Sequence, residues 1–189
     1  MLIAIVVIGA VLVIVATILL FLFNRLVRLR NKVDNAWHQI DVQLKRRYDL
    51  LPELAEVVKG YASHEQNALQ SAARARAEAV NAPSVGEQGP AEDNLTGAIG
   101  GLLAVAERYP DLKANQDFLK FQQEIATTEN RIAGSRKYYN GAVMYYDNAR
   151  QAFPGNIVAR LFAGMFPDRD YFEIQEPADR RVPQVPDLN

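Results

Sequence analysis

The chain contains no cysteine and only two histidines among its 189 residues. The absence of cysteine excludes a disulfide-stapled extracellular domain. His38 and His64 have no second ligand at the spacings that hold a metal ion on a helix, so we expect neither a metal nor a cofactor. The formal net charge is −1, which provides no large basic footprint for nucleic acid, and we expect none as a partner.

The sequence also lacks a recognisable catalytic motif, because it has no Gly-rich phosphate loop and no GxSxG sequence. Ser63-His64-Glu65 contains the residue types of nucleophilic catalysis. Consecutive helical positions point about 100° apart, so these three side chains cannot form one relay on a helix. We interpret the tripeptide as an exposed polar turn and predict that the protein is not an enzyme.

What the sequence does have is a long apolar run, Leu2–Phe23, without a charged residue. As a helix, a run of this length spans roughly 33 Å, enough to cross a bilayer core of about 30 Å. A cleavable signal peptide has a shorter apolar run of about 7–15 residues and a small-residue cleavage site, which is missing here. We therefore interpret residues 1–24 as an uncleaved transmembrane anchor.

The residues that flank the run predict its orientation. Four basic residues and no acidic one follow it, namely Arg25, Arg28, Arg30 and Lys32, whereas only the α-amino group precedes it. The flank richer in Lys and Arg stays in the cytoplasm. We predict a single-pass protein of the inner (cytoplasmic) membrane, with its N-terminus outside and its C-terminal domain in the cytoplasm.

Helix formers dominate the rest of the chain, and no alternating, strand-like run of useful length occurs, so we expect an all-α fold. Apolar residues at three- and four-residue spacing indicate two long helical seams. The first comprises Val33, Trp37, Ile40, Leu44 and Leu51; the second, on a helix over 116–153, comprises Phe118, Phe121, Ile125, Thr128, Ile132, Tyr139, Val143, Tyr146 and Phe153.

Proline and glycine mark the expected breaks between helices. Pro52 either kinks the first helix or starts a new one, and the pattern leaves both open. Residues 81–94 are polar, with two prolines and two glycines, and predict a mobile loop. A helix over 95–109 follows, whose small-residue face (Gly97, Ala98, Gly101) suggests tight packing. We expect a helical bundle over 25–166 and a proline-rich, irregular tail over 167–189.

Several longer motifs resemble the bacterial LemA family. They are VDNAW at 33–37, QIDVQLKRRYDL at 39–50, YPDLKAN at 109–115 and TENRIA at 128–133. The resemblance implies an up-and-down bundle of the four-helix type behind an N-terminal membrane helix, and it implies no reaction. Relatives occur beside genes of membrane metalloproteases, and one branch of the family helps to build magnetosome membranes.

Two clusters are candidate functional residues. Lys45, Arg46 and Arg47 form a dense basic group, which is either a partner-docking site or a face that forms salt bridges within the bundle. The short helix over 157–166 has a broad apolar face made of Ile157, Leu161, Phe162, Met165 and Phe166. This helix either lies on the membrane interface or closes the end of the bundle.

Together these features predict a membrane-anchored scaffold or adaptor. Its expected partners are the lipid bilayer, other membrane or envelope proteins including a membrane metalloprotease, and further copies of itself. The first alternative is a self-assembling protein that organises or shapes the membrane. The second is an enzyme cofactor module or weak hydrolase, which the missing site disfavours.

Overall fold

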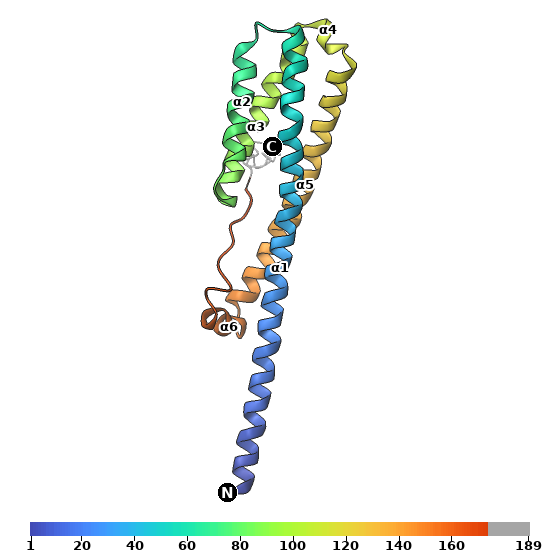
Figure 1. The fold of residues 1–189 in the computed structure, drawn as a ribbon. Coiled ribbons are helices and arrows are strands. Elements are labelled where there is room, and N and C mark those ends of the chain that lie inside the picture. The colour runs from blue at the N-terminus through green and yellow to red at the C-terminus, as the bar shows by residue number, and fades with distance from the viewer. Residues whose placement is uncertain (174–189) are drawn as a thin grey trace, which may run out of the picture. The chain divides into compact units, whose positions relative to one another are not determined.

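The computed structural model describes residues 1–173 of the chain, and these are helices and their connections (Figure 1). The helices are α1 (Leu2–Tyr61), α2 (Gln66–Val80), α3 (Val85–Val105), α4 (Pro110–Lys113), α5 (Gln116–Gln151) and α6 (Gly155–Leu161), with a 3₁₀ turn η1 (Ala106–Arg108). No strand occurs in this part of the chain, so the predicted all-α class is confirmed. Residues 167–173 contain no helix, and the rest of the predicted tail lies outside the described residues.

The chain divides into two compact units. Unit 1 consists of Met1–Lys45 and Thr128–Tyr171, and unit 2 consists of Arg46–Thr127 together with Phe172 and Glu173. Both α1 and α5 contribute residues to each unit.

Helix α1 continues through Pro52 and ends only at Tyr61, so Pro52 does not begin a new helix. Proline has no N–H, which leaves the carbonyl four residues earlier, that of Tyr48, without its helical donor. The Arg76 side chain fills this gap, because its Nε donates a hydrogen bond of 2.7 Å to that carbonyl oxygen. The interruption is thus compensated by a residue of α2.

Four helical segments surround the core of unit 2. Successive segments run in alternating directions (Figure 1). The core takes apolar residues from α1, α2, α3 and the first part of α5, and these are Leu51, Leu54, Val58, Ala72, Ala75, Ala79, Leu95, Ile99, Leu102, Val105, Phe118 and Ile125. Asn115 caps α5, as its Oδ1 accepts a hydrogen bond of 2.9 Å from the Phe118 N–H.

In unit 1, α1 and the second part of α5 bury the seams that the sequence indicated. The buried residues include Val33, Ile40 and Leu44 from α1 and Ile132, Tyr139, Val143 and Tyr146 from α5. Trp37 meets Tyr139 edge-on, with 5.4 Å between their ring centroids. Phe153 departs from the seam, because it follows the end of α5 and its side chain is exposed.

The segment 167–171, which follows α6, lies along α5 of unit 1. Two tyrosine hydroxyls of α5 donate hydrogen bonds to backbone carbonyls of this segment. The Tyr146 hydroxyl donates to the Pro167 carbonyl (2.9 Å), and the Tyr139 hydroxyl donates to the Asp170 carbonyl (2.8 Å). Arg169 also pairs with Asp34 of α1 at 2.7 Å. The first residues of the predicted irregular tail therefore have a defined path without regular secondary structure.

The predicted loop over residues 81–94 is wrong, because α3 begins at Val85 and leaves only a short connection. Ser84 caps α3, and its side chain accepts a hydrogen bond from the Glu87 N–H. Gln88, Gly89 and Glu92 are buried, so tertiary contacts stabilise a helix that its proline and glycines disfavour.

The tight packing predicted for the small-residue face of α3 is wrong at its two glycines, although Ala98 packs against the core. A Cβ added to Gly97 or Gly101 would meet no atom within 4 Å, and both residues are exposed. The close approach occurs instead at Gly89, where a Cβ would lie 1.9 Å from the carbonyl oxygen of Glu173.

Candidate functional site

The basic cluster on α1 divides into exposed and buried members. Lys45 is exposed, and Arg46 is about half-exposed and lies 3.3 Å from Glu124 of α5. Arg47 has only 2% of its side chain exposed, and its Nη1 lies 3.1 Å from Glu92 Oε2 on α3. A docking partner would not reach Arg47 in this structure, so the predicted docking surface reduces to Lys45 and Arg46.

Arg47 and Glu92 belong to a buried polar network within unit 2. A second Arg47 nitrogen, Nη2, donates to Thr96 Oγ1 at 2.6 Å. The Gln88 side-chain amide donates to Glu92 Oε1 at 2.9 Å, and the Tyr48 hydroxyl donates to the same oxygen. Each oxygen of the Glu92 carboxylate is therefore hydrogen-bonded, which a carboxylate with no solvent exposure requires.

Within this network, the pKa of the Tyr48 hydroxyl is raised above its ordinary value. Burial is the largest cause, and the hydrogen bond to the negative Glu92 carboxylate adds to it. The neutral hydroxyl is thus retained as a donor. A buried ion pair of this kind is suited to fixing the register of α1 against α3. We expected salt bridges of the basic cluster within the bundle, and the partner of Arg47 is a residue of α3.

The sequence alone did not reveal the α3 residues of this network. Gln88, Glu92 and Thr96 recur every four residues and therefore share one face of α3. That spacing was a usable signal, but it has meaning only on a helix, and residues 81–94 were interpreted as a loop.

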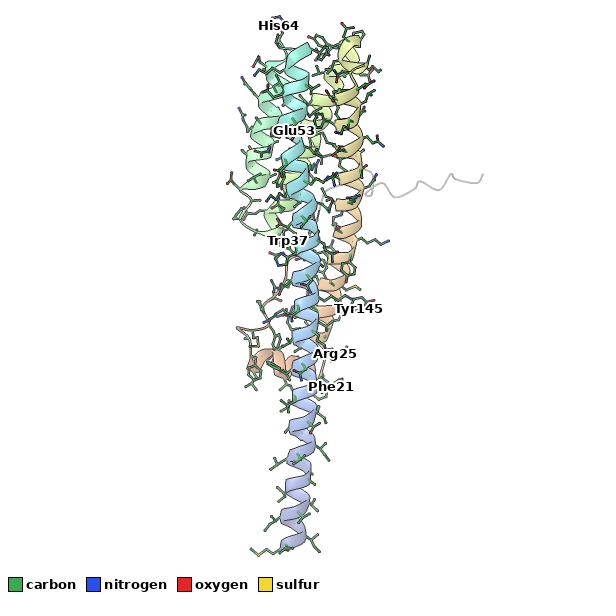
Figure 2. All side chains as sticks on the ribbon, turned by 45° about the vertical axis from the view of Figure 1, so that its right-hand side comes forward. Phe21, Arg25, Trp37, Glu53, His64 and Tyr145 are labelled. Atoms are coloured by element: carbon green, nitrogen blue, oxygen red, sulfur yellow. The ribbon has the colours of Figure 1, made fainter. Side chains whose placement is uncertain are left out.

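Ser63-His64-Glu65 lies in the turn between α1 and α2, as predicted (Figure 2). The Glu65 carboxylate accepts hydrogen bonds from Arg108 (2.9 Å) and from the Tyr109 hydroxyl (3.3 Å). Glu65 therefore connects this turn to the segment after α3. Within residues 1–173, no group of three or more His, Asp or Glu side chains is placed to hold a metal ion.

The apolar run forms the first part of α1, and the side chains of Leu2–Phe21 are exposed to the surroundings. By length and composition, this part of α1 can cross a membrane. Burial begins at Leu22 and Leu26, where the end of α5 meets α1. Figure 2 shows Phe21 on the uncovered part of α1 and Arg25 one turn further along.

The five residues predicted for the membrane interface have different environments. Ile157, Leu161, Phe162 and Met165 are exposed, with Leu161 the most open at 71%. Phe166 is only 1% exposed and lies against Phe23 of α1, with 5.5 Å between the ring centroids. Phe166 therefore belongs to the interior of unit 1, and the other four form the apolar surface of α6 and the turn after it.

Arg30 attaches this turn to α1. Its Nη1 donates a hydrogen bond of 3.3 Å to the carbonyl oxygen of Met165. Of the four basic residues that follow the apolar run, Arg30 and Lys32 thus have contacts within unit 1, because Lys32 also lies 5.6 Å from the ring centre of Tyr138. Arg25 and Arg28 are exposed.

An uncovered apolar helix that leads directly into an all-α body fits a single-pass membrane protein. The family model described as the LemA family matches residues 36–186. The chain belongs to the LemA family.

Individual relatives agree with this membership. The chain is 30% identical to Protein LemA of Metamycoplasma hominis over 142 residues, which cover 72% of this chain and 63% of that protein. The chain thus spans less than two thirds of the length of that relative. It is 23% identical to Magnetosome protein MamQ 2 of Paramagnetospirillum magneticum, covering 87% of this chain and 69% of the relative. It is 22% identical to Magnetosome protein MamQ of Magnetospirillum gryphiswaldense, and the match covers 89% of this chain and 72% of that relative.

Proposed function

We propose that the protein is a membrane-anchored scaffold or adaptor of the LemA type, with its body in the cytoplasm. The observation that carries this proposal is the continuity of α1. The same helix supplies the uncovered Leu2–Phe21 and the buried core residues Leu26 and Val33 of unit 1. No linker separates the two parts, so a body built on this helix is held at the membrane into which the helix inserts.

The surface that we assign to partner docking is formed by Lys45 and Arg46. Both side chains are available to an acidic partner, because Lys45 is exposed and the ion pair between Arg46 and Glu124 is open to solvent. Exposed pairs of this kind contribute only about 0–1 kcal/mol and exchange readily for another carboxylate. The proposed partner is a membrane or envelope protein, and a membrane metalloprotease is one candidate.

Charge reversal tests this assignment. A photo-crosslinker at Gln43, close to the pair, should capture a defined partner in native membranes. Lys45→Glu combined with Arg46→Glu should abolish that product and leave helicity unchanged, because like charges repel at a docking surface and Glu is a good helix former. Lys120→Glu with Lys137→Glu, two exposed residues of α5, is the matched control. A product that survives the Lys45/Arg46 reversal contradicts the assignment.

The proposal assigns no reaction to the protein. Its support is the arrangement at Ser63-His64-Glu65, where the Glu65 carboxylate is occupied by Arg108 and Tyr109 and lies at the end of a turn. A hydrolase assay with broad ester and peptide substrates should give the same rate for the full chain and for His64→Ala.

A second candidate function is the organisation of membranes by self-assembly. The similarity to proteins named magnetosome proteins supports it, since the match extends over most of this chain. Reconstitution of the full chain into vesicles separates the two functions. Ordered oligomers that deform the vesicles favour the membrane-organising function, whereas undeformed vesicles and a stoichiometric partner in native membranes favour the adaptor.

A further inference from the structure

The helix α6 has two faces of different burial. Its inner residues Val158 and Ala159 are buried in unit 1, together with Phe166 of the following turn. Apart from Arg160, the large exposed side chains of α6 and its two flanking turns are apolar, and they are Phe153, Ile157, Leu161, Phe162 and Met165. Phe153 is 79% exposed and Leu161 is 71% exposed. Exposing several large apolar side chains to water is unfavourable, and such a surface typically marks an interaction site.

This apolar surface is continuous with the end of the membrane span. The Phe23 ring meets Phe162 edge-on, with 5.1 Å between their ring centroids. Leu19 and Leu20 of α1 line one groove together with Leu161 and Phe162, and no polar residue lines it. Figures 1 and 2 both show α6 beside α1 at the level where the uncovered part of α1 ends.

The charges around this surface match those of a phospholipid boundary. Arg25, Arg28 and Arg160 are exposed. Neither 19–32 nor 153–166 contains an acidic residue. Basic residues beside an apolar face are typical of helices that lie in the headgroup region and attract anionic lipid.

From these observations we infer that α6 and the Phe153 turn form a second membrane contact, which inserts into the headgroup–acyl boundary of the leaflet from which α1 emerges. The inference rests on the proposed membrane anchorage of α1 and extends it. About 20 residues of helix cross a bilayer core, so the core ends near Phe21 and Phe23. Leu161 and Phe162, which meet α1 at that level, then face the boundary rather than water.

Because the chain has no cysteine, single-cysteine variants place a probe at one chosen position. The full chain is reconstituted into vesicles of phosphatidylglycerol and phosphatidylethanolamine, and an environment-sensitive fluorophore is attached at Leu161→Cys. Parallel vesicles contain lipids with a nitroxide quencher near the headgroup end of the acyl chain or near its terminal methyl group.

Two further variants provide controls in the same vesicles. Val11→Cys lies on the uncovered part of α1 and reports whether the anchor spans the bilayer. Val42→Cys is also exposed and belongs to unit 1, but it lies about 28 Å along α1 from Phe23. Circular dichroism of each labelled variant confirms that the fold is retained.

We expect about twofold or greater quenching of the Leu161 probe by the shallow nitroxide and little by the deep one, as for an interfacial helix. The Val11 probe should respond to the deep nitroxide, and the Val42 probe to neither. If the Val11 probe is quenched and the Leu161 probe emits as it does in water, the inference about α6 is overturned while the proposed membrane anchorage of α1 is retained. Apolar emission from Leu161 without quenching shows a protein cover, such as a second copy, and also overturns it. If Val11 is not quenched, both proposals fail.

Discussion

At the scale of single residues, Arg47 and Glu92 show how burial changes the meaning of a basic motif. Lys45, Arg46 and Arg47 are consecutive, yet only Arg47 points into unit 2, where it meets a carboxylate at 3.1 Å. A buried ion pair is a weak source of net stability, but removing one partner leaves an uncompensated charge and costs about 3–5 kcal/mol.

We therefore predict that Arg47→Ala destabilises the full chain in detergent micelles by about 3–5 kcal/mol, measured by urea unfolding. Arg46→Ala is the control, and it should change stability by less than about 1 kcal/mol because its pair with Glu124 is exposed. Replacing Arg47 and Glu92 together by methionine should restore much of the loss. Equal effects of the two single alanine variants would show that Arg47 is not buried.

Tyr139 gives a prediction about pH. Burial raises the pKa of its hydroxyl to about 12, above its ordinary value of 10.0. The unfolded chain therefore loses this proton at lower pH than the folded chain does. Stability is fully present below pH 10 and is lost as the pH rises through about 12.

The measurement is the free energy of unfolding in detergent micelles from about pH 9 to about pH 12, for the parent chain and for Tyr139→Phe. Over this range the hydroxyl of the unfolded chain loses its proton before that of the folded chain. Tyr139→Phe should be less stable at neutral pH, because the hydrogen bond to the Asp170 carbonyl is lost. Its stability should fall less steeply above pH 10. Parallel curves would contradict the assigned burial of Tyr139.

At the scale of elements, α3 shows that a glycine can be required by a neighbour rather than by its own backbone. No glycine in residues 1–173 has a positive φ angle, so conformation does not demand glycine at position 89. The Glu173 carbonyl demands glycine there instead, because a Cβ at position 89 would clash with its oxygen.

Gly89→Ala should therefore lower the stability of the chain by about 1 kcal/mol or more, because the Glu173 backbone has to move. Gly97→Ala, in the same helix, meets open space and should raise stability by up to about 1 kcal/mol through helix propensity. Thermal unfolding of the two variants compares them directly. A gain for Gly89→Ala as large as that for Gly97→Ala would refute the close approach of the C-terminal segment.

Elements with a strong apolar period were predictable from the sequence, including the part of α3 after Leu95, whereas the first part of α3, residues 85–94, was not. The seams of α1 and α5 repeat every three or four residues over long distances, and the structure buries Val33, Ile40, Ile132 and Tyr146 as expected. The first two turns of α3 instead contain glycine and proline and gain their stability from contacts of Gln88 and Glu92. The glycines and the proline concealed the four-residue spacing of Gln88, Glu92 and Thr96, so the helix start and the buried network were both missed.

The candidate sites were predictable to a similar extent. Sequence showed that the segment over 157–166 is apolar, but only the packing of unit 1, which buries Val158, Ala159 and Phe166, separates the inner from the outer residues. Likewise, sequence located the basic cluster, but only the packing of α3 against α1 shows that Arg47 is inside.

At the scale of the whole molecule, the apolar run and the basic residues that follow it determine how the chain is placed at a membrane. By length and composition, the uncovered run can cross a bilayer core of about 30 Å. Arg25 and Arg28, both exposed, support our proposal that the body continues on the cytoplasmic side. Arg30 and Lys32 add to the excess of basic residues on this flank of the apolar run, although both also have contacts within unit 1.

The most direct test of this account is the accessibility of single cysteines to a membrane-impermeant maleimide in intact cells. Leu2→Cys lies at the exposed start of α1, and Ser63→Cys lies in the exposed turn after α1. We predict that Leu2→Cys is labelled from outside, while Ser63→Cys is labelled only after the membrane is permeabilised. Labelling of Ser63→Cys but not of Leu2→Cys in intact cells would contradict the proposed orientation, and recovery of the chain in the soluble fraction would contradict the anchor itself.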